Sequence, residues 1–288
     1  CVITNGYGLM FGIHAGECDL VVTDCVISNL IMPGIFTTHN RESAWNISIN
    51  GCEINGSLGI DLRSNTTESI DIRNCRIYGG IVGIGMSVNC PIVIENNDIY
   101  DMEKWGIHFA HRSFSENHAV IKNNRIHNCQ TGIEVGEEGD DEDLFLDIQF
   151  NTIAYTHFPL ILKGQFPSPV IRNNIFACND VRVMYYRNVR HPPDQDYNLF
   201  WNRGVAFDPE LRYHYSVWCG DNDIFADPLF ADENDLHLAF NSPAINRGDP
   251  ELEVGDEPQP NGGRVNLGGF GTTSEATVSP EEALGGIP

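Results

Sequence analysis

The sequence predicts an all-β protein, a single-stranded parallel β-helix of about eight coils followed by a non-repetitive C-terminal segment. Two observations predict it. One motif returns about every two dozen residues, and short stretches between its copies alternate apolar and polar residues. A fixed repeat of this length is typical of solenoids, in which each unit buries its apolar face against the next. Alternation over four to six residues rich in Val and Ile indicates strands.

The first repeated element is an apolar residue, then Asn or Cys, then a second apolar residue. Because Asn tolerates left-handed backbone geometry and its amide can hydrogen-bond to neighbours, we interpret the copies as a ladder in the bends of the coil. The Cys copies are interpreted as small buried side chains, with a disulfide between adjacent coils as the alternative. The copies are centred on Cys25, Cys52, Cys75, Asn97, Asn124, Asn151, Asn174 and Asn198.

The second repeated element is a small residue, usually Gly, followed by Ile and an alternating stretch. Together the two elements predict two or three short strands per turn. Each turn advances by one strand spacing of about 4.8 Å, so eight turns form a rod about 40 Å long. The copies cover residues 11–15, 33–37, 58–62, 82–86, 105–109 and 132–135, with weaker ones at 158–163 and 181–186.

Composition excludes several classes of partner. The formal net charge is -23, with 40 acidic residues against 17 Lys plus Arg. So negative a surface repels nucleic acids and anionic membranes, and no apolar run is long enough to insert into a bilayer. The nine Cys residues contain no CxxC pair, which argues against a zinc module or a dense disulfide framework. We expect a monomer.

The repeats end before the chain does. We expect residues 1–207 to form the β-helix and residues 208–250 to be an excursion that packs on the last coils. Residues 251–288 are rich in Gly, Pro and acidic residues and are expected to form a loosely held tail.

The chain resembles the right-handed parallel β-helix proteins of the pectin-lyase-like fold, and in particular bacterial secreted members. The short repeats, the closing segment 224–250 (IFADPLF…SPAINRGDP) and residues 258–271 (PQPNGGRVNLGGFG) carry the resemblance. It covers nearly the whole chain and implies a right-handed coil and a secreted or cell-surface location. This fold hosts lyases, hydrolases, epimerases and non-catalytic binders.

Outward residues one repeat apart become neighbours on the surface of a β-helix. Ionisable side chains gather in the central coils, with small residues between them, so a site is predicted there. The first column is His14, Phe36, Asp61, Gly85, His108, Glu134 and Ile161, and the second is Gly16, Thr38, Arg63, Ser87, Ala110, Gly136 and Lys163.

The spacing between strands lets us compare two mechanisms, hydrolysis by two carboxylates and proton abstraction by a base. The two acids of a glycosidase must lie about 5–9.5 Å apart, whereas Asp61 and Glu134 are three turns, about 14 Å, apart. His108 and Glu134 are one turn apart, which suits a carboxylate that orients an imidazole. The columns therefore favour base-assisted proton abstraction over hydrolysis by two carboxylates.

The resemblance implies a reaction. Many lyases of this fold cleave polyuronates by β-elimination and neutralise the uronate carboxylate with Ca²⁺ or with Arg and Lys. Trp218 is preferred over Trp105 for sugar contacts, because Trp105 is expected at a coil corner. The implied roles are His108 as base, Arg63 and Lys163 as carboxylate partners, Asp61 and Glu134 as Ca²⁺ ligands, and Tyr185, Tyr186, Arg187 and Trp218 as substrate-binding residues.

We therefore predict a polysaccharide-active protein, a lyase or epimerase of uronate-containing glycans. One alternative is a non-catalytic surface binding or scaffold module, whose polar column is only a solvated face. The other is a glycoside hydrolase with acids in loops near Asp180, Asp194 or Asp196. The negative net charge opposes capture of a polyanion, and Ca²⁺ or the cationic residues between 163 and 212 would soften that repulsion.

Overall fold

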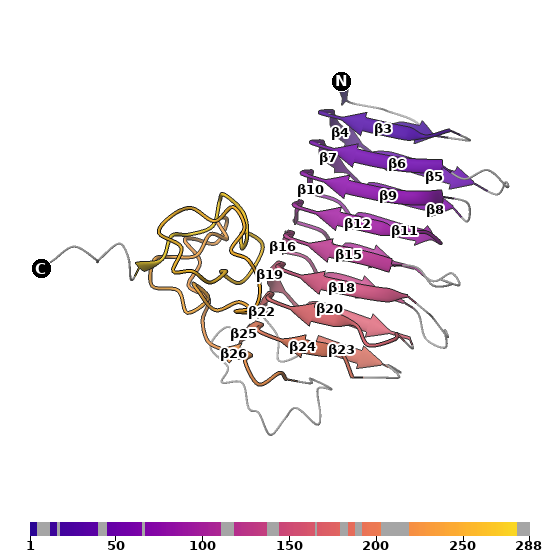
Figure 1. Ribbon diagram of the computed structural model, residues 1–288. Helices are drawn as coiled ribbons and strands as arrows, with labels where there is room; N and C mark the ends of the chain where they lie inside the picture. Colours follow the sequence, from indigo (N-terminus) through magenta and orange to yellow (C-terminus); the bar gives the residue numbers. More distant parts are fainter. Residues whose placement is uncertain are drawn as a thin grey trace, which may run out of the picture.

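A parallel β-solenoid makes up most of the molecule, and Figure 1 shows its coils stacked from the N-terminus downward. Every named element is a strand, so the all-β prediction is confirmed. The computed structural model describes residues 1–4, 12–15, 18–39, 45–64, 67–110, 118–136, 144–164, 166–178, 184–187, 192–202 and 219–280.

Each coil contributes one strand to each of three parallel sheets, here called A, B and C. One central coil consists of β11 (Val82–Val88) in sheet B, β12 (Ile92–Glu95) in sheet C and β13 (Asp98–Tyr100) in sheet A. Sheets B and C have eight strands each, which make seven steps along the axis. The solenoid therefore has seven to eight turns, and the predicted number of about eight is confirmed.

Sheet A follows the Asn/Cys bends and is the longest sheet, with ten strands. Its other members are β1 (Val2–Thr4), β4 (Val26–Leu30), β7 (Glu53–Gly56), β10 (Arg76–Tyr78), β16 (Arg125–His127), β19 (Thr152–Thr156), β22 (Ile175–Cys178), β25 (Leu199–Asn202) and β26 (Ile224–Phe225).

Sheet B carries the Gly-Ile element. Its other members are β2 (Ile13–Ala15), β5 (Ile35–His39), β8 (Leu58–Ser64), β14 (Trp105–Phe109), β17 (Thr131–Val135), β20 (Phe158–Lys163) and β23 (Met184–Arg187). Those of sheet C are β3 (Leu20–Thr23), β6 (Trp45–Asn50), β9 (Thr67–Arg73), β15 (His118–Lys122), β18 (Phe145–Gln149), β21 (Val170–Arg172) and β24 (Asp194–Asp196).

The predicted ladder lies inside the coil, between sheets C and A. Asn151 shows its pattern: its Oδ1 accepts from the backbone N–H of Asn124 at 3.0 Å, and its Nδ2 donates to Oδ1 of Asn174 at 3.1 Å. The left-handed backbone belongs to the preceding residue, for example Phe150 with φ 52°, and not to the ladder Asn. Asp223 ends the ladder by accepting from the backbone N–H of Asn198 at 2.7 Å. The ladder residues Asn97, Asn124, Asn151, Asn174 and Asn198 are fully buried.

The Cys members of the ladder, Cys25, Cys52 and Cys75, are buried and carry free thiols. The interpretation as small buried side chains is therefore the one that the structure supports.

The glycine of the Gly-Ile element lies where the coil bends from sheet A into sheet B. A Cβ on Gly83 would lie 2.6 Å from the carbonyl oxygen of Gly106 and 2.6 Å from Cγ2 of Ile99. Strand pairing passes over this residue, joining Val82 to Trp105 and then Ile84 to Ile107. Glycine lets the two sheets approach this closely, whereas Pro159 occupies the same position on β20. The same crowding recurs at Gly12, Gly34, Gly59, Gly106 and Gly132.

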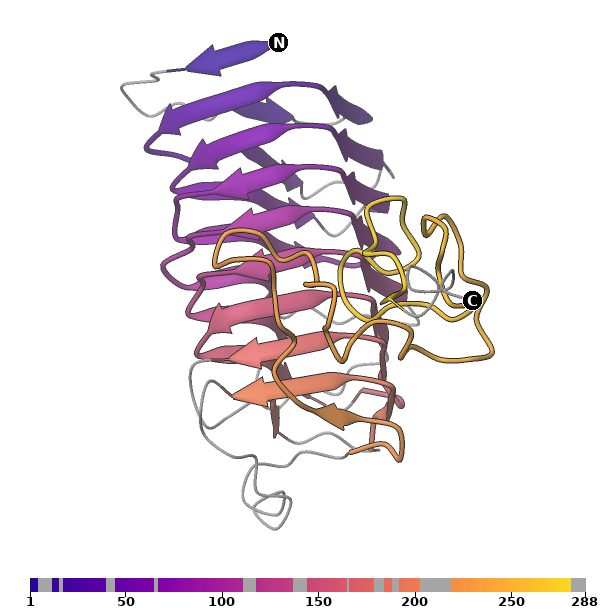
Figure 2. The same cartoon turned by 90° about the vertical axis from the view of Figure 1, so that its left-hand side faces the viewer.

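Residues 227–280, here called the C-terminal module, pack on the outer face of sheet A beside β16 to β25 (Figures 1 and 2). Leu267 and Val265 are buried, and the backbone N–H of Gly269 donates to Oγ1 of Thr152 at 2.8 Å. The expectation of a loosely held tail is thus wrong for residues 251–279. The last coils present small and apolar outward residues such as Ala154, against which a few apolar side chains and glycine backbone can dock. Residues 281–288 lie outside the described part.

Gly83 and Gly85 lie two residues apart on β11, but substitution by alanine should affect the free energy of unfolding very differently at the two positions. Gly83→Ala is expected to lower the free energy of unfolding by more than about 2 kcal/mol, because its Cβ overlaps backbone and a buried methyl group. Gly85→Ala should change it by less than about 0.5 kcal/mol, since the added Cβ has no neighbour closer than 3.6 Å. Urea unfolding measures both, and equal losses would contradict the packing argument.

Asn151→Ala removes an acceptor that the buried backbone N–H of Asn124 needs. We expect a loss of at least about 3 kcal/mol in the free energy of unfolding, because buried polar groups are left unsatisfied. The matched variant Asn50→Ala removes a partly exposed acceptor of one bond from Asn74 and should cost less than about 1 kcal/mol. A small loss for Asn151→Ala would show that the ladder is not a stabilising element.

Candidate functional site

The predicted first column exists on sheet B. Strand pairing places Asp61 beside Gly85, Gly85 beside His108, and His108 beside Glu134. In the second column Arg63 lies beside Ser87. Gly16, at the start of that column, lies outside the described residues.

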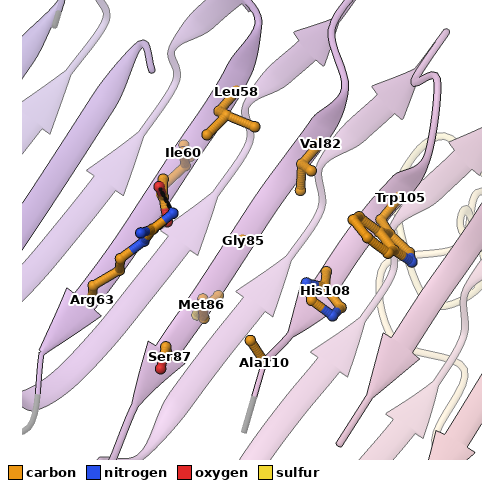
Figure 3. Close-up of a pocket in the computed structure, with 11 residues that line it drawn as sticks. Leu58, Ile60, Arg63, Val82, Gly85, Met86, Ser87, Trp105, His108 and Ala110 are labelled. Atoms are coloured by element: carbon orange, nitrogen blue, oxygen red, sulfur yellow. Dashed lines mark hydrogen bonds and ion pairs between the residues drawn. The ribbon is translucent and has the colours of Figure 1, made fainter. Parts of the chain in front are cut away.

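A hollow of about 330 Å³, here called the groove, lies over these central coils. Figure 3 shows the bare position of Gly85 between Arg63 on one side and His108 on the other. The strands β8, β11 and β14 supply the two walls and the floor. The lining consists of Leu58, Ile60, Asp61, Arg63, Val82, Gly85, Met86, Ser87, Trp105, His108 and Ala110.

The β8 wall ends in an ion pair. Nε of Arg63 donates to Oδ1 of Asp61 at 3.0 Å, and Nη2 lies 2.8 Å from Oδ2. The Asp61 side chain is 8% exposed and that of Arg63 is 56% exposed. The carboxylate therefore fixes the guanidinium at the edge of the groove and leaves Nη1 for a ligand.

The β14 wall is a stacked pair of rings. The centroids of Trp105 and His108 are 4.3 Å apart and their planes differ by 13°. Residues three apart in a regular strand point to opposite faces. Here Gly106 turns into the bend, so both rings lie on the outer face.

Glu134 holds this wall from the next strand. Its Oε2 accepts from Nε1 of Trp105 at 2.9 Å, and its Oε1 accepts from Nζ of Lys163 at 2.7 Å. The Glu134 side chain is only 10% exposed. We expected this carboxylate to orient His108 directly. It instead fixes the indole that covers one face of the imidazole.

Trp105 is the residue that sequence reasoning missed. Simple alternation places it on the face opposite His108, and it was expected at a coil corner. The signal lay in its position directly before the Gly-Ile element, since the residues before Gly and after Ile share the outer face. Leu58 and Asp61 repeat this spacing on β8.

The other predicted site residues lie farther along sheet B or outside the described part of the chain. Lys163, on β20, is two strand spacings from His108 and is paired with Glu134. Tyr185, Tyr186 and Arg187 lie on β23, three strand spacings from β14, and the structure describes their backbone only. Trp218 falls outside the described residues.

The two predicted Ca²⁺ ligands do not fit a shared ion. Asp61 and Glu134 lie three strands, about 14 Å, apart, whereas ligand oxygens lie about 2.3–2.6 Å from Ca²⁺. Both carboxylates are already paired, with Arg63 and Lys163. Within the ranges that the structure describes, no group of three His, Cys, Asp or Glu side chains could hold a metal ion.

Comparison with known proteins identifies the family. A family model described as a right handed beta helix region matches residues 11–154, which is half of the chain. The chain belongs to this family. The match confirms the right-handed coil and the predicted fold resemblance. No curated protein and no solved structure gives a significant match. The described part of this right-handed β-helix protein contains no helix long and apolar enough to cross a membrane.

The Glu134 bridge should stabilise the β14 wall. Glu134→Ala leaves the indole N–H and the Lys163 ammonium without their acceptor, and we expect it to cost about 2–4 kcal/mol of unfolding free energy. Glu134→Gln keeps an acceptor for Trp105 and should cost about 1 kcal/mol.

Urea unfolding and quenching of tryptophan fluorescence by acrylamide measure the effects of the Glu134 variants. Asp71→Ala, which removes a half-exposed partner of Arg73 on sheet C, serves as the control and should cost less than about 1 kcal/mol. Equal losses in all three variants would rule out a specific role for Glu134.

Proposed function

We propose that the groove binds one sugar unit of a polysaccharide, and that the protein is a lyase or epimerase of uronate-containing glycans. One observation carries the proposal: the ring-stacked imidazole of His108 faces the guanidinium of Arg63 across the bare position of Gly85. A base and a cation on opposite sides of a ligand-sized gap are the two groups that proton abstraction beside a carboxylate requires.

The spacing suits a sugar ring. β8 and β14 are two strand spacings, about 10 Å, apart, and Gly85 leaves the floor between them open. A pyranose lying there meets the apolar side chains of Leu58 and Val82 below and the Trp105 ring at one end. Aromatic and apolar contacts with a few placed polar groups are typical of small-ligand sites.

The chemistry follows from the two walls. Arg63 donates through Nη1 to the uronate carboxylate and stabilises the negative charge that develops on it. The imidazole of His108 takes the C5 proton. In a lyase the electron pair forms a C4=C5 double bond and the C4–O bond breaks, and the leaving oxygen takes a proton from water. In an epimerase a water molecule on the opposite face donates a proton to C5.

The non-catalytic binding module stays the second candidate, and one observation favours it. Asp61 and Glu134 neutralise Arg63 and Lys163, so the groove and its surroundings offer little net positive charge to an acidic sugar. The hydrolase alternative has less support. Asp194 pairs with Arg172, and Asp196 accepts from Asn222, so both hold the end of the solenoid together.

The predicted polysaccharide partner, secreted or cell-surface location, monomeric state and Ca²⁺ requirement stay predictions. Any Ca²⁺ in this mechanism would bind between the protein and the uronate, because Asp61 and Glu134 do not converge.

His108→Ala tests the base. Wild-type protein incubated with pectate or alginate, with and without Ca²⁺, should produce the ultraviolet absorbance of a conjugated double bond. We expect the variant to lose at least about a hundredfold of this rate, the usual contribution of a general base. The control His118→Ala, on an exposed position of sheet C, should keep it.

Gly85→Leu tests the groove without removing a catalytic group. The side chain fills the floor, where a Cβ meets only ordinary contacts, so the fold should persist while activity is lost. Full activity in His108→Ala would overturn the assignment of the base. If the wild type eliminates neither substrate but binds glycan, and Gly85→Leu does not bind it, the protein is a binding module.

A further inference from the structure

A second hollow, of about 270 Å³, lies on the outer face of sheet A. We call it the sheet A pocket. It lies at the edge of the C-terminal module, where Arg125 contacts Phe270, and Figure 1 shows β7 and β10 beyond that edge. Strand pairing places Glu53, Arg76, Asp98 and Arg125 side by side in its floor.

The side chains of Glu53 and Asp98 contact outward residues of the next column on sheet A, Tyr78 and His127. Oε1 of Glu53 accepts from the hydroxyl of Tyr78 at 2.9 Å, and Oδ1 of Asp98 lies 3.6 Å from Nε2 of His127. The bond to Glu53 raises the pKa of Tyr78, so the phenol stays a neutral donor. Neither acid forms an ion pair with an arginine in the described part of the chain.

The two arginines are left without carboxylate partners. Arg76 is exposed, and its side chain makes no hydrogen bond, ion pair or ring contact with any described residue. Arg125 is half-buried: its guanidinium lies 5.0 Å from the ring centroid of Phe270, and its Nη1 donates weakly to Asn96 at 3.5 Å. Burial lowers the pKa of Arg125. The nearby carboxylates of Asp98 and Glu275 oppose this lowering of the pKa, but neither forms an ion pair with Arg125 in the described part of the chain.

Other cations of the described part of the chain, such as Lys104 and Lys122, also lack an ion pair, and this hollow differs because two unpaired guanidinium groups share it. With 40 acidic residues against 17 Lys plus Arg, acids for every cation are plentiful. Arg73, on the neighbouring sheet C, has two of them, Asp71 and Glu95. Two unpaired guanidinium groups in one hollow therefore leave room for an anion from outside.

We propose that the sheet A pocket binds the anionic group of an acidic sugar, a carboxylate or a sulfate, between the guanidinium groups of Arg76 and Arg125. Guanidinium forks match such oxyanions with two parallel hydrogen bonds. β10 and β16 are about 10 Å apart, with β13 between them. The inference that the bound anion belongs to a sugar rests on the proposed function. The inference that the pocket binds an oxyanion does not depend on it.

Another polar hollow contains arginines and is an alternative binding site for the same anions. It lies in the C-terminal module, has a volume of about 350 Å³ and contains Arg247 and Arg264. Nε and Nη2 of Arg264 donate to the carbonyl oxygens of Gly248 and Arg247 at 2.5 Å and 3.4 Å, so Arg247 is the more accessible of the two arginines. Arg247→Gln is therefore a matched control for Arg76→Gln, since both remove an exposed arginine.

Isothermal titration calorimetry of the full chain tests the proposal with galacturonate, galactose 6-sulfate and neutral galactose. The two anions separate the carboxylate from the sulfate source. We expect at least one anion to bind and galactose to bind at least about tenfold more weakly. Arg76→Gln should weaken the anion at least about tenfold, whereas Arg247→Gln should leave it unchanged.

Arg125→Lys keeps the charge but loses the fork, and it should also weaken binding. Loss of binding in Gly85→Leu but not in Arg76→Gln would place the ligand in the groove, overturning this proposal while supporting the proposed function. Loss in Arg247→Gln alone would place it in the C-terminal module and overturn the proposal as well. Absence of binding by both anions at millimolar concentration would also overturn it, and the elimination assay would still decide the proposed function.

Discussion

The close approach of sheets A and B at the glycine column is the constraint on which the rest of the structure depends. At each copy, the missing side chain leaves space for a methyl group of an Ile in sheet A and for a carbonyl oxygen of the next coil. At Gly12, Gly34, Gly59, Gly83, Gly106 and Gly132 a larger residue would force the sheets apart or break the ladder of strand hydrogen bonds, whereas β20 has Pro159 at this position. Because the coils stack in register, an error at one coil displaces its neighbours.

The same glycine shapes the outer surface. By turning into the bend, it interrupts the alternation of the strand, so the residues before Gly and after Ile point outward together. Trp105 and His108 can stack for this reason, and Val82 and Gly85 line the same floor. The groove is therefore a consequence of how the coil turns its corner, and its walls are as rigid as the solenoid beneath them.

Charge is arranged differently on the two outer faces. On sheet B the cations are held by buried or nearly buried carboxylates, Arg63 by Asp61 and Lys163 by Glu134, which fixes geometry at the expense of net positive charge. On sheet A the acids bond to an aromatic column, and Arg76 and Arg125 are left without them. The first arrangement suits a site in which position matters most, and the second suits the capture of an anion.

Sequence alone determined the solenoid, its number of coils and the neighbours within each column, because a repeat in register makes sequence distance a measure of spatial distance. It therefore placed Asp61, Gly85, His108 and Glu134 correctly relative to one another. The tertiary structure decided what no periodicity can show: that Glu134 bonds to Trp105 and Lys163, and that residues 251–279 dock on sheet A. These outcomes depend on side-chain direction at a bend and on contacts between segments more than 100 residues apart, such as Thr152 and Gly269. Neither is encoded in the local alternation from which the strands were predicted.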